Sequence, residues 1–206
     1  MPIASISKLM TAMVVIDSEQ ALDPRIAIKK QDVDRLRYSS SRLPVGTQWS
    51  RHELLRIMLV SSDNRAAFAL ARTHQWGKAV FVYEMNQKAF RLGMVNTQFI
   101  EPSGLSHRNL STVRDLAKMV WLAHQYDLIR QLTTLKTSQI PFNRSDNKTI
   151  QFRNTNLLLF RKGWRIGLSK TGFIHEAGYC LVLQVNIADR DLIVVLLKST
   201  QSKRAF

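Results

Sequence analysis

Three short motifs occur in order along this chain, and together they constrain its fold more than any other feature. They are Ser5-Ile6-Ser7-Lys8, Ser62-Asp63-Asn64 and Lys170-Thr171-Gly172. Each motif alone occurs by chance in many proteins, but the ordered set indicates an enzyme with an active-site serine. The chain must therefore bring three distant segments to one cleft, with room for a helical region between the first motif and the last.

The first two thirds of the chain carry helix patterns. Residues 4–20 are apolar on nearly every side, which predicts a buried helix. Ser50 and Glu53 form a capping box at the start of another helix, and Gly93 is suited to end a helix in the left-handed conformation. The second motif is expected in a turn between helices, because Asp and Asn favour turns. The further helices are predicted over about 50–61, 65–72, 77–92 and from Thr112 onward.

Strand patterns dominate after Pro141. In this region, strands are predicted over 149–153, 164–171, 178–187 and 192–199, the last two as a hairpin around residues 189–191. One further short strand is predicted earlier in the chain, over 26–30. We therefore expect an α+β fold with a single catalytic domain over 1–206. It would have a helical lobe at about 31–140 and an antiparallel sheet lobe at about 1–30 and 141–206, with helices flanking the sheet.

Ser5 and Lys8 are the candidate nucleophile and base. A serine hydroxyl becomes a good nucleophile only when a neighbouring group takes its proton, and side chains three residues apart lie on one face of a helix. Because the surrounding helix is apolar, we expect Lys8 to be partly desolvated. Desolvation lowers the pKa of an ammonium group and leaves some neutral amine to act as a base.

The second motif is expected to serve the leaving group. Ser62 would continue the proton relay towards the leaving nitrogen. The Asn64 amide would hydrogen-bond a substrate amide carbonyl, whereas Asp63 would point away and fix the turn.

The third motif is expected to bind the substrate. Lys170 would bring positive charge to Ser62 and to a substrate carboxylate, and Thr171 would offer a hydroxyl to the same carboxylate. Gly172 would let the backbone approach closely. The N–H of Phe173, with the N–H of Ser5, would complete an oxyanion hole.

With the residues that flank the motifs, the chain resembles the low-molecular-mass penicillin-binding proteins, the D-alanyl-D-alanine carboxypeptidases and endopeptidases of bacterial cell-wall metabolism. The resemblance covers nearly the whole chain. It includes residues 2–12, the Glu101-Pro102-Ser103-Gly104-Leu105 loop with residues 111–117, and residues 170–179. The stretches 152–156 and 169–173 are most similar to the endopeptidase branch, which cuts the cross-link between D-alanine and diaminopimelate.

The resemblance implies a penicillin-binding-protein and β-lactamase-like transpeptidase fold and an acyl-enzyme on Ser5. It further implies peptidoglycan peptide stems as substrates, β-lactams as inhibitors, no cofactor and a periplasmic location. In that family, sheet-forming residues precede the first motif and a closing helix follows the last strand. We therefore expect that this chain, which runs from Met1 to Phe206, is truncated at both ends.

The formal net charge of +15 predicts attraction to a polyanion. No nucleic-acid-binding motif accompanies the charge, so we expect a solvated surface near an anionic cell envelope and no nucleic-acid partner. No apolar stretch is long enough to span a bilayer, and no export signal precedes the first motif. Cys180 lies in an apolar run and is expected to be a buried, inert thiol.

Three features are interpreted as structural. Ser145-Asp146-Asn147 repeats the second motif, but it lies in a polar loop and is read as a turn. Glu101 lacks the Glu-x-x-Leu-Asn pattern of the deacylating glutamate in class A β-lactamases, because Leu105 lies four residues on and Ser106 follows, and this spacing argues against a β-lactamase. The five histidines show no paired metal-ligand spacing, so no metal is predicted.

Two other functions remain open from the sequence. One is a serine β-lactamase. The other is a catalytically inactive, truncated protein that binds the cell envelope through its basic charge. For a peptidase, the motifs leave endopeptidase and carboxypeptidase activity equally open, because both use the same residues.

Overall fold

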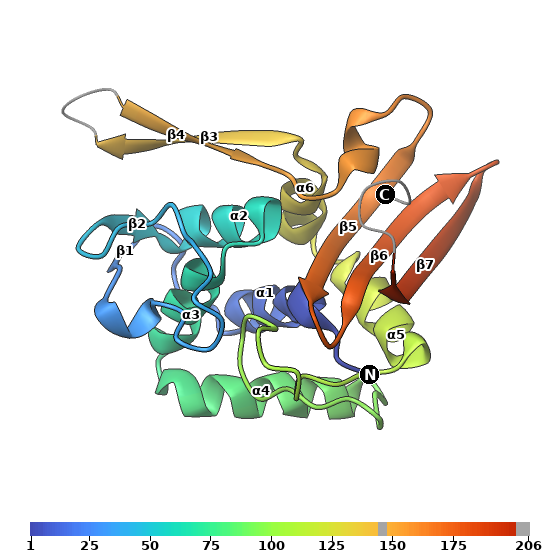
Figure 1. The fold of residues 1–206 in the computed structure, drawn as a ribbon, viewed down its shortest axis with the longest axis horizontal. Coiled ribbons are helices and arrows are strands. Elements are labelled where there is room, and N and C mark those ends of the chain that lie inside the picture. The colour runs from blue at the N-terminus through green and yellow to red at the C-terminus, as the bar shows by residue number, and fades with distance from the viewer. Residues whose placement is uncertain (144–147, 201–206) are drawn as a thin grey trace.

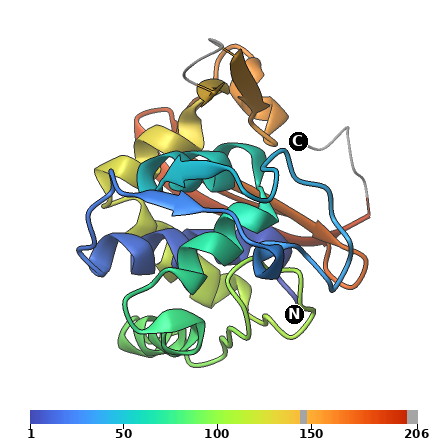
Figure 2. The same ribbon diagram turned by 90° about the vertical axis from the view of Figure 1, so that its left-hand side faces the viewer.

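The computed structural model describes residues 1–143 and 148–200, which form an α+β fold (Figures 1 and 2). The second Ser-Asp-Asn pattern, at 145–147, lies outside the described residues. The helices, with η for 3₁₀ helices, are η1 (Ala4–Ile6), α1 (Ser7–Asp17), η2 (Lys30–Asp32), α2 (Arg51–Ser61), α3 (Asn64–Arg72), α4 (Gly77–Arg91), α5 (Val113–Ala123), α6 (Asp127–Thr134) and η3 (Leu157–Phe160). The strands are β1 (Arg25–Ala27), β2 (Gln48–Ser50), β3 (Thr137–Asn143), β4 (Lys148–Arg153), β5 (Arg165–Ile174), β6 (Gly178–Ile187) and β7 (Arg190–Ser199).

Helix α1 lies at the centre of the molecule (Figure 1). Its residues 7–15 are all buried, and it contacts α2, α3, α4, α5 and α6. The prediction of a buried helix is confirmed, because a helix packed on all sides needs no polar face. It is shorter than the predicted 4–20: it begins with the 3₁₀ turn η1 and ends at Asp17, shortly before Glu19 takes a positive φ of 52°.

The second motif forms the turn between α2 and α3, as predicted. The capping box at the start of α2 is present: Ser50 Oγ accepts from Glu53 N at 3.0 Å, and Glu53 Oε2 accepts from Ser50 N at 2.7 Å. Ser62 ends α2 with left-handed backbone angles, and Asp63 caps α3 by accepting from Ala66 N at 3.0 Å.

The predicted boundaries of the next helices are also confirmed. Gly93 follows α4 with φ of 64°, and Thr112 Oγ1 accepts from Asp115 N at 3.2 Å at the start of α5. Helix α6 was not predicted. Within the described ranges, no helix combines the length and apolar content that a membrane crossing requires.

The sheet β5-β6-β7 is antiparallel and lies to the right of α1 in Figure 1. α5 contacts β6 and β7, and α6 contacts β5, so these two helices connect the sheet to the rest of the core. The predicted hairpin joins β6 to β7 through Ala188 and Asp189, which both have positive φ. The turn η1 packs against β5 and β6, which places the first motif beside the third.

Two strand pairs lie outside this sheet. β1 pairs with β2, although we expected the 26–30 strand within the sheet lobe, and β3 pairs with β4 in a ribbon that projects at the top of Figures 1 and 2. Strand β3 was missed because Pro141 interrupts its pattern, and the register of the ribbon does shift between Pro141 and Asn143. Ile140 and Phe152 are buried and anchor the ribbon to the core.

Candidate active site

The first and second motifs meet at the side chain of Lys8. Its Nζ donates to Ser5 Oγ at 2.7 Å, to Asn64 Oδ1 at 2.7 Å and to the backbone carbonyl of Ser103 at 2.6 Å. Only the contact with Ser5 follows from the sequence spacing. The helix turn that carries both residues sets this contact, whereas Asn64 and Ser103 reach Lys8 from distant segments.

Lys8 is fully buried, and burial lowers the pKa of its amine from 10.5 to about 8. The carboxylates of Glu101, Asp63 and Asp34 oppose this shift, because negative charge favours the ammonium form. An amine with this pKa is partly neutral near neutral pH. It can therefore accept a proton from the hydroxyl that it contacts.

The second and third motifs meet at the side chain of Lys170. Its Nζ donates to Ser62 Oγ and to the carbonyl of Thr171, both at 2.9 Å. Lys170 is also buried, and burial together with the positive charge of Lys8 holds its pKa well below the usual value. Ser62 has φ of 60°, which is uncommon for a residue with a Cβ. Such strained conformations cluster at active sites.

Gly172 lies directly against the turn that carries Ser5. A Cβ added at Gly172 would lie 2.8 Å from Ser5 N and 3.0 Å from the Ala4 Cβ. A Cβ added at Gly104 would lie 1.9 Å from Ala4 O. Both glycines therefore allow β5 and the 101–106 loop to close on the serine turn, and this supplies a physical reason for the glycine in the third motif.

Two pockets adjoin Ser62. The serine pocket has a volume of about 310 Å³ and is lined by Ser5, Ser62, Thr155, Leu157, Thr171, Gly172, Phe173, Tyr179 and Cys180. The arginine pocket has a volume of about 350 Å³ and is lined by Ser40, Ser41, Arg42, Ser61, Ser62, Asp63, Asn64, Phe152 and Arg153. Lys8 and Lys170 are buried beside these surfaces. All eight residues predicted from the sequence therefore lie in one region, and their catalytic roles remain predictions.

Ser39, whose hydroxyl holds the side-chain amide of Asn64, was not identified from the sequence. Asn64 Nδ2 donates to Ser39 Oγ at 2.9 Å, and Ser39 Oγ donates to Asp34 Oδ2 at 2.6 Å. Burial works to raise the pKa of Asp34, but hydrogen bonds from Ser39 and from the backbone of residues 36, 37 and 39 outweigh it and lower that pKa. No local motif identifies this contact, because Ser39 and Asn64 are brought together only by folding.

Glu101 shapes the loop that contacts Lys8. Its carboxylate accepts from Ser103 N at 2.7 Å, Ser103 Oγ at 2.5 Å, Gly104 N at 2.6 Å and Ser106 N at 3.2 Å. Both carboxylate oxygens are thus engaged by the loop whose Ser103 carbonyl accepts from Lys8. The Glu101 carboxylate therefore holds this loop in place beside Lys8.

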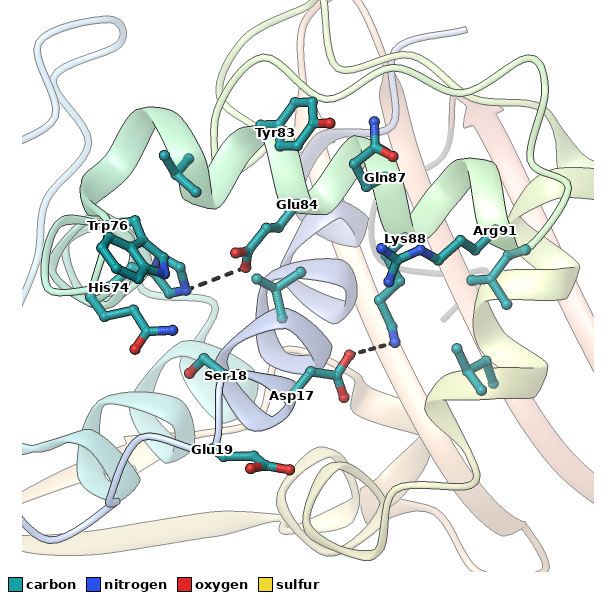
Figure 3. Close-up of a pocket in the computed structure, with 15 residues that line it drawn as sticks. Asp17, Ser18, Glu19, His74, Trp76, Tyr83, Glu84, Gln87, Lys88 and Arg91 are labelled. Atoms are coloured by element: carbon teal, nitrogen blue, oxygen red, sulfur yellow. Dashed lines mark hydrogen bonds and ion pairs between the residues drawn. The ribbon is translucent and has the colours of Figure 1, made fainter.

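A larger pocket, of about 960 Å³, lies between α4 and the end of α1 (Figure 3). None of the motif residues lines it. Four of the titratable side chains that line it form two pairs: His74 Nε2 lies 3.3 Å from Glu84 Oε2, and Lys88 Nζ lies 2.5 Å from Asp17 Oδ2. We therefore place the candidate active site at Ser5 and not in this pocket.

The fold and the three converging motifs define a protein of the penicillin-binding and DD-transpeptidase type. Among solved structures, the DD-transpeptidase of Streptomyces K15 matches with a TM-score of 0.88 and 29% identity, over 97% of this chain and 81% of that one. A D-alanyl-D-alanine carboxypeptidase from Mycobacterium tuberculosis matches with a TM-score of 0.82 and 28% identity, over 95% and 73%. These matches confirm the predicted fold class.

The chain belongs to the D-alanyl-D-alanine carboxypeptidase family, whose model matches residues 1–201. A D-alanyl-D-alanine endopeptidase from Pseudomonas aeruginosa is 47% identical, and one from Escherichia coli is 43% identical. Each comparison covers 95% of this chain and 63% of the relative. The chain thus spans a little under two thirds of the length of these curated relatives.

Proposed function

We propose that this protein is a serine-type DD-peptidase that hydrolyses the stem peptides or cross-links of peptidoglycan through an acyl-enzyme on Ser5. The observation that carries the proposal is the 2.7 Å hydrogen bond between Lys8 Nζ and Ser5 Oγ, made by a buried lysine with a lowered pKa. The names of the two relatives with 43% and 47% identity support the endopeptidase branch.

In the proposed acylation step, neutral Lys8 takes the proton of the Ser5 hydroxyl. Ser5 Oγ then attacks the carbonyl carbon of a D-alanyl residue, and a tetrahedral intermediate forms. The N–H groups of Ser5 and Phe173 would stabilise the negative oxygen of this intermediate. This role for Phe173 is supported by the position of β5 at the edge of the β5-β6-β7 sheet, where alternate N–H groups face away from β6.

Collapse of the intermediate breaks the carbon–nitrogen bond, and the leaving nitrogen takes a proton from the Ser62 hydroxyl. The proton that Lys8 took from Ser5 would then pass to Ser62, which restores the Ser62 hydroxyl and leaves Lys8 neutral again. Lys170, which donates to Ser62 Oγ at 2.9 Å, would favour both transfers. Water then attacks the ester on Ser5, with Lys8 again accepting a proton. The acyl peptide leaves, and Ser5 is regenerated.

Substrate binding would use the polar groups around the serine pocket. The Asn64 amide would bind an amide carbonyl of the stem peptide. Thr171 and Lys170 would bind the carboxylate next to the scissile amide. The same groups would bind a β-lactam, whose ring carbonyl would acylate Ser5, and the substrate class favours a periplasmic location.

The test is acylation by a labelled penicillin, with Ser5→Ala as the matched control. The proposal predicts one label per protein in the parent, none in Ser5→Ala, and cleavage of defined cross-linked muropeptide dimers by the parent alone. Equal labelling of the two proteins would reject it. Rapid turnover of the β-lactam, in place of a long-lived adduct, would favour a β-lactamase. Salt-sensitive sedimentation with cell wall, without labelling, would favour the inactive envelope-binding alternative.

A further inference from the structure

The arginine pocket carries positive charge that the proposed reaction does not use. Arg42 and Arg153 both line it, next to Ser62 and Asn64. Arg42 lies in the loop before β2, and Arg153 is the last residue of β4. The two residues are therefore far apart in the sequence and line the same pocket only in the folded chain. Two arginines beside the candidate reacting groups are suited to hold an anionic part of a substrate.

Neither arginine is neutralised by an acid within the described part of the chain. Arg42 Nη1 donates to the backbone carbonyl of Gln151 at 2.6 Å, which holds the guanidinium against β4. The guanidinium carbon of Arg153 lies 4.6 Å from the centre of the Phe160 ring. Both contacts orient a guanidinium without neutralising it, and each leaves further N–H donors for a ligand.

Asp63 is the only acid among the described residues that line the arginine pocket. Its carboxylate is already engaged, because it accepts from Ser41 Oγ at 2.8 Å and from Ala66 N at 3.0 Å. Burial raises the pKa of Asp63, and the nearby cations Lys8 and Arg65 oppose that rise. Asp63 as a whole residue is only 8% exposed. The charge that a ligand can reach in this pocket is therefore positive.

We propose that the arginine pocket binds a second substrate carboxylate, carried by the stem peptide away from the scissile amide. This inference rests on the proposed function. Diaminopimelate has two amino and two carboxyl groups, so a cross-linked stem keeps free carboxylates after its amide bonds are made. One of them lies beside the scissile amide and is assigned to Lys170 and Thr171, and a more distant one is assigned to Arg42 and Arg153.

The test compares two synthetic cross-linked stem dimers. In both, the carboxylate beside the scissile amide stays free, and the remaining carboxylates are free in one dimer and amidated in the other. We expect the parent protein to cleave the free form with a kcat/KM roughly tenfold higher, as two partly exposed ion pairs would produce. The preference should lie mainly in KM, because the contact is made equally in ground and transition states, and it should fade at high salt.

The variants isolate the two arginines. Arg42→Gln and Arg153→Gln should each reduce the preference, and the double variant should cleave both dimers equally. Arg42→Lys should keep most of it, because it retains the charge. Arg114→Gln, which removes an exposed positive charge on α5, is the matched control and should keep the full preference.

Equal cleavage of both dimers by the parent protein would overturn the inference, as would a preference that survives in the double variant. In both cases the proposed function would stand, because the dimers are still cleaved. If the parent protein is not labelled by penicillin and cleaves neither dimer, the proposed function fails, and the carboxylate assignment fails with it.

Discussion

The side-chain nitrogen Nζ of Lys170 lies 2.9 Å from the hydroxyl oxygen of Ser62, although 108 residues separate the two in the chain. Lys170 is buried on β5, and Ser62 is held in a left-handed conformation where α2 ends. The contact joins the sheet to the helical region at the serine pocket. It therefore couples the correct packing of these two parts to the geometry of the proposed proton transfer.

Replacing Lys170 by Met should separate catalysis from stability. The variant loses the donor to Ser62, so we expect acylation by penicillin to slow on the order of 10²–10³-fold, as for the loss of one preorganised donor. The free energy of unfolding should stay equal or rise, because a buried polar amine is replaced by an apolar side chain of similar size. Stopped-flow acylation and urea unfolding measure the two effects. A variant that acylates at the parental rate would remove Lys170 from the proposed relay.

The acylation rate should depend on pH through Lys8. With a pKa of about 8, Lys8 is mostly protonated at pH 6 and cannot accept the Ser5 proton. The rate should rise with pH and reach half its maximum near pH 8. Glu101→Gln should move this midpoint to lower pH, because the carboxylate of Glu101 favours the ammonium form. A midpoint that rises in Glu101→Gln would contradict the assignment.

Stability should also depend on pH through Lys8. Below pH 8, the amine is protonated in both the folded and the unfolded chain, so the cost of burying the cation is present in full. Between pH 8 and 10.5, the unfolded chain still binds a proton that the folded chain has released, and stability rises with pH by about 3 kcal/mol. Urea unfolding across this range should show that the rise is missing in Lys8→Met. Parallel curves for the two proteins would count against the lowered pKa.

Gly172→Ala should impair acylation through a steric contact. The added methyl group would lie 2.8 Å from Ser5 N, so either β5 or the serine turn must shift. We expect acylation to slow at least tenfold, the order of loss caused by small misplacements of reacting groups. Gly163→Ala is the control: its Cβ would meet nothing within 4 Å, but its φ is +87°. It should lose roughly 1–2 kcal/mol of stability and acylate at the parental rate.

Ser39 should position Asn64 without touching the substrate. Ser39→Ala removes the acceptor for Asn64 Nδ2, so the amide can rotate and present its NH₂ group to Lys8. We expect slower acylation and a changed pH midpoint, since Lys8 would lose the acceptor that it contacts at 2.7 Å. Ser39→Thr keeps the hydroxyl and should restore both. An unchanged pH profile in Ser39→Ala would leave Ser39 with a structural role only.

Local patterns predicted the elements whose causes are local. The Ser50 and Glu53 capping box, the Thr112 cap and the Gly93 terminator depend on residues within one turn of each other, and all three are observed. Strands β5, β6 and β7 followed from β-rich runs that are either continuous or alternate with a period of two. Helix α6 and strand β3 were not predicted. Pro141 interrupts the strand pattern of β3, and the short helix α6 packs against the distant elements α2 and β5.

The sequence by itself predicted the candidate reacting groups, and it determined the contact of Ser5 with Lys8 and the turn that holds Ser62. These follow from short spacings along a helix and from capping chemistry, which act over a few residues. Only the tertiary structure decided that Asn64, Ser103 and Glu101 surround Lys8, and that Arg42 and Arg153 meet at one pocket. Burial is a property of the packed chain, so the lowered pKa of Lys8 exists only when every surrounding element is in place.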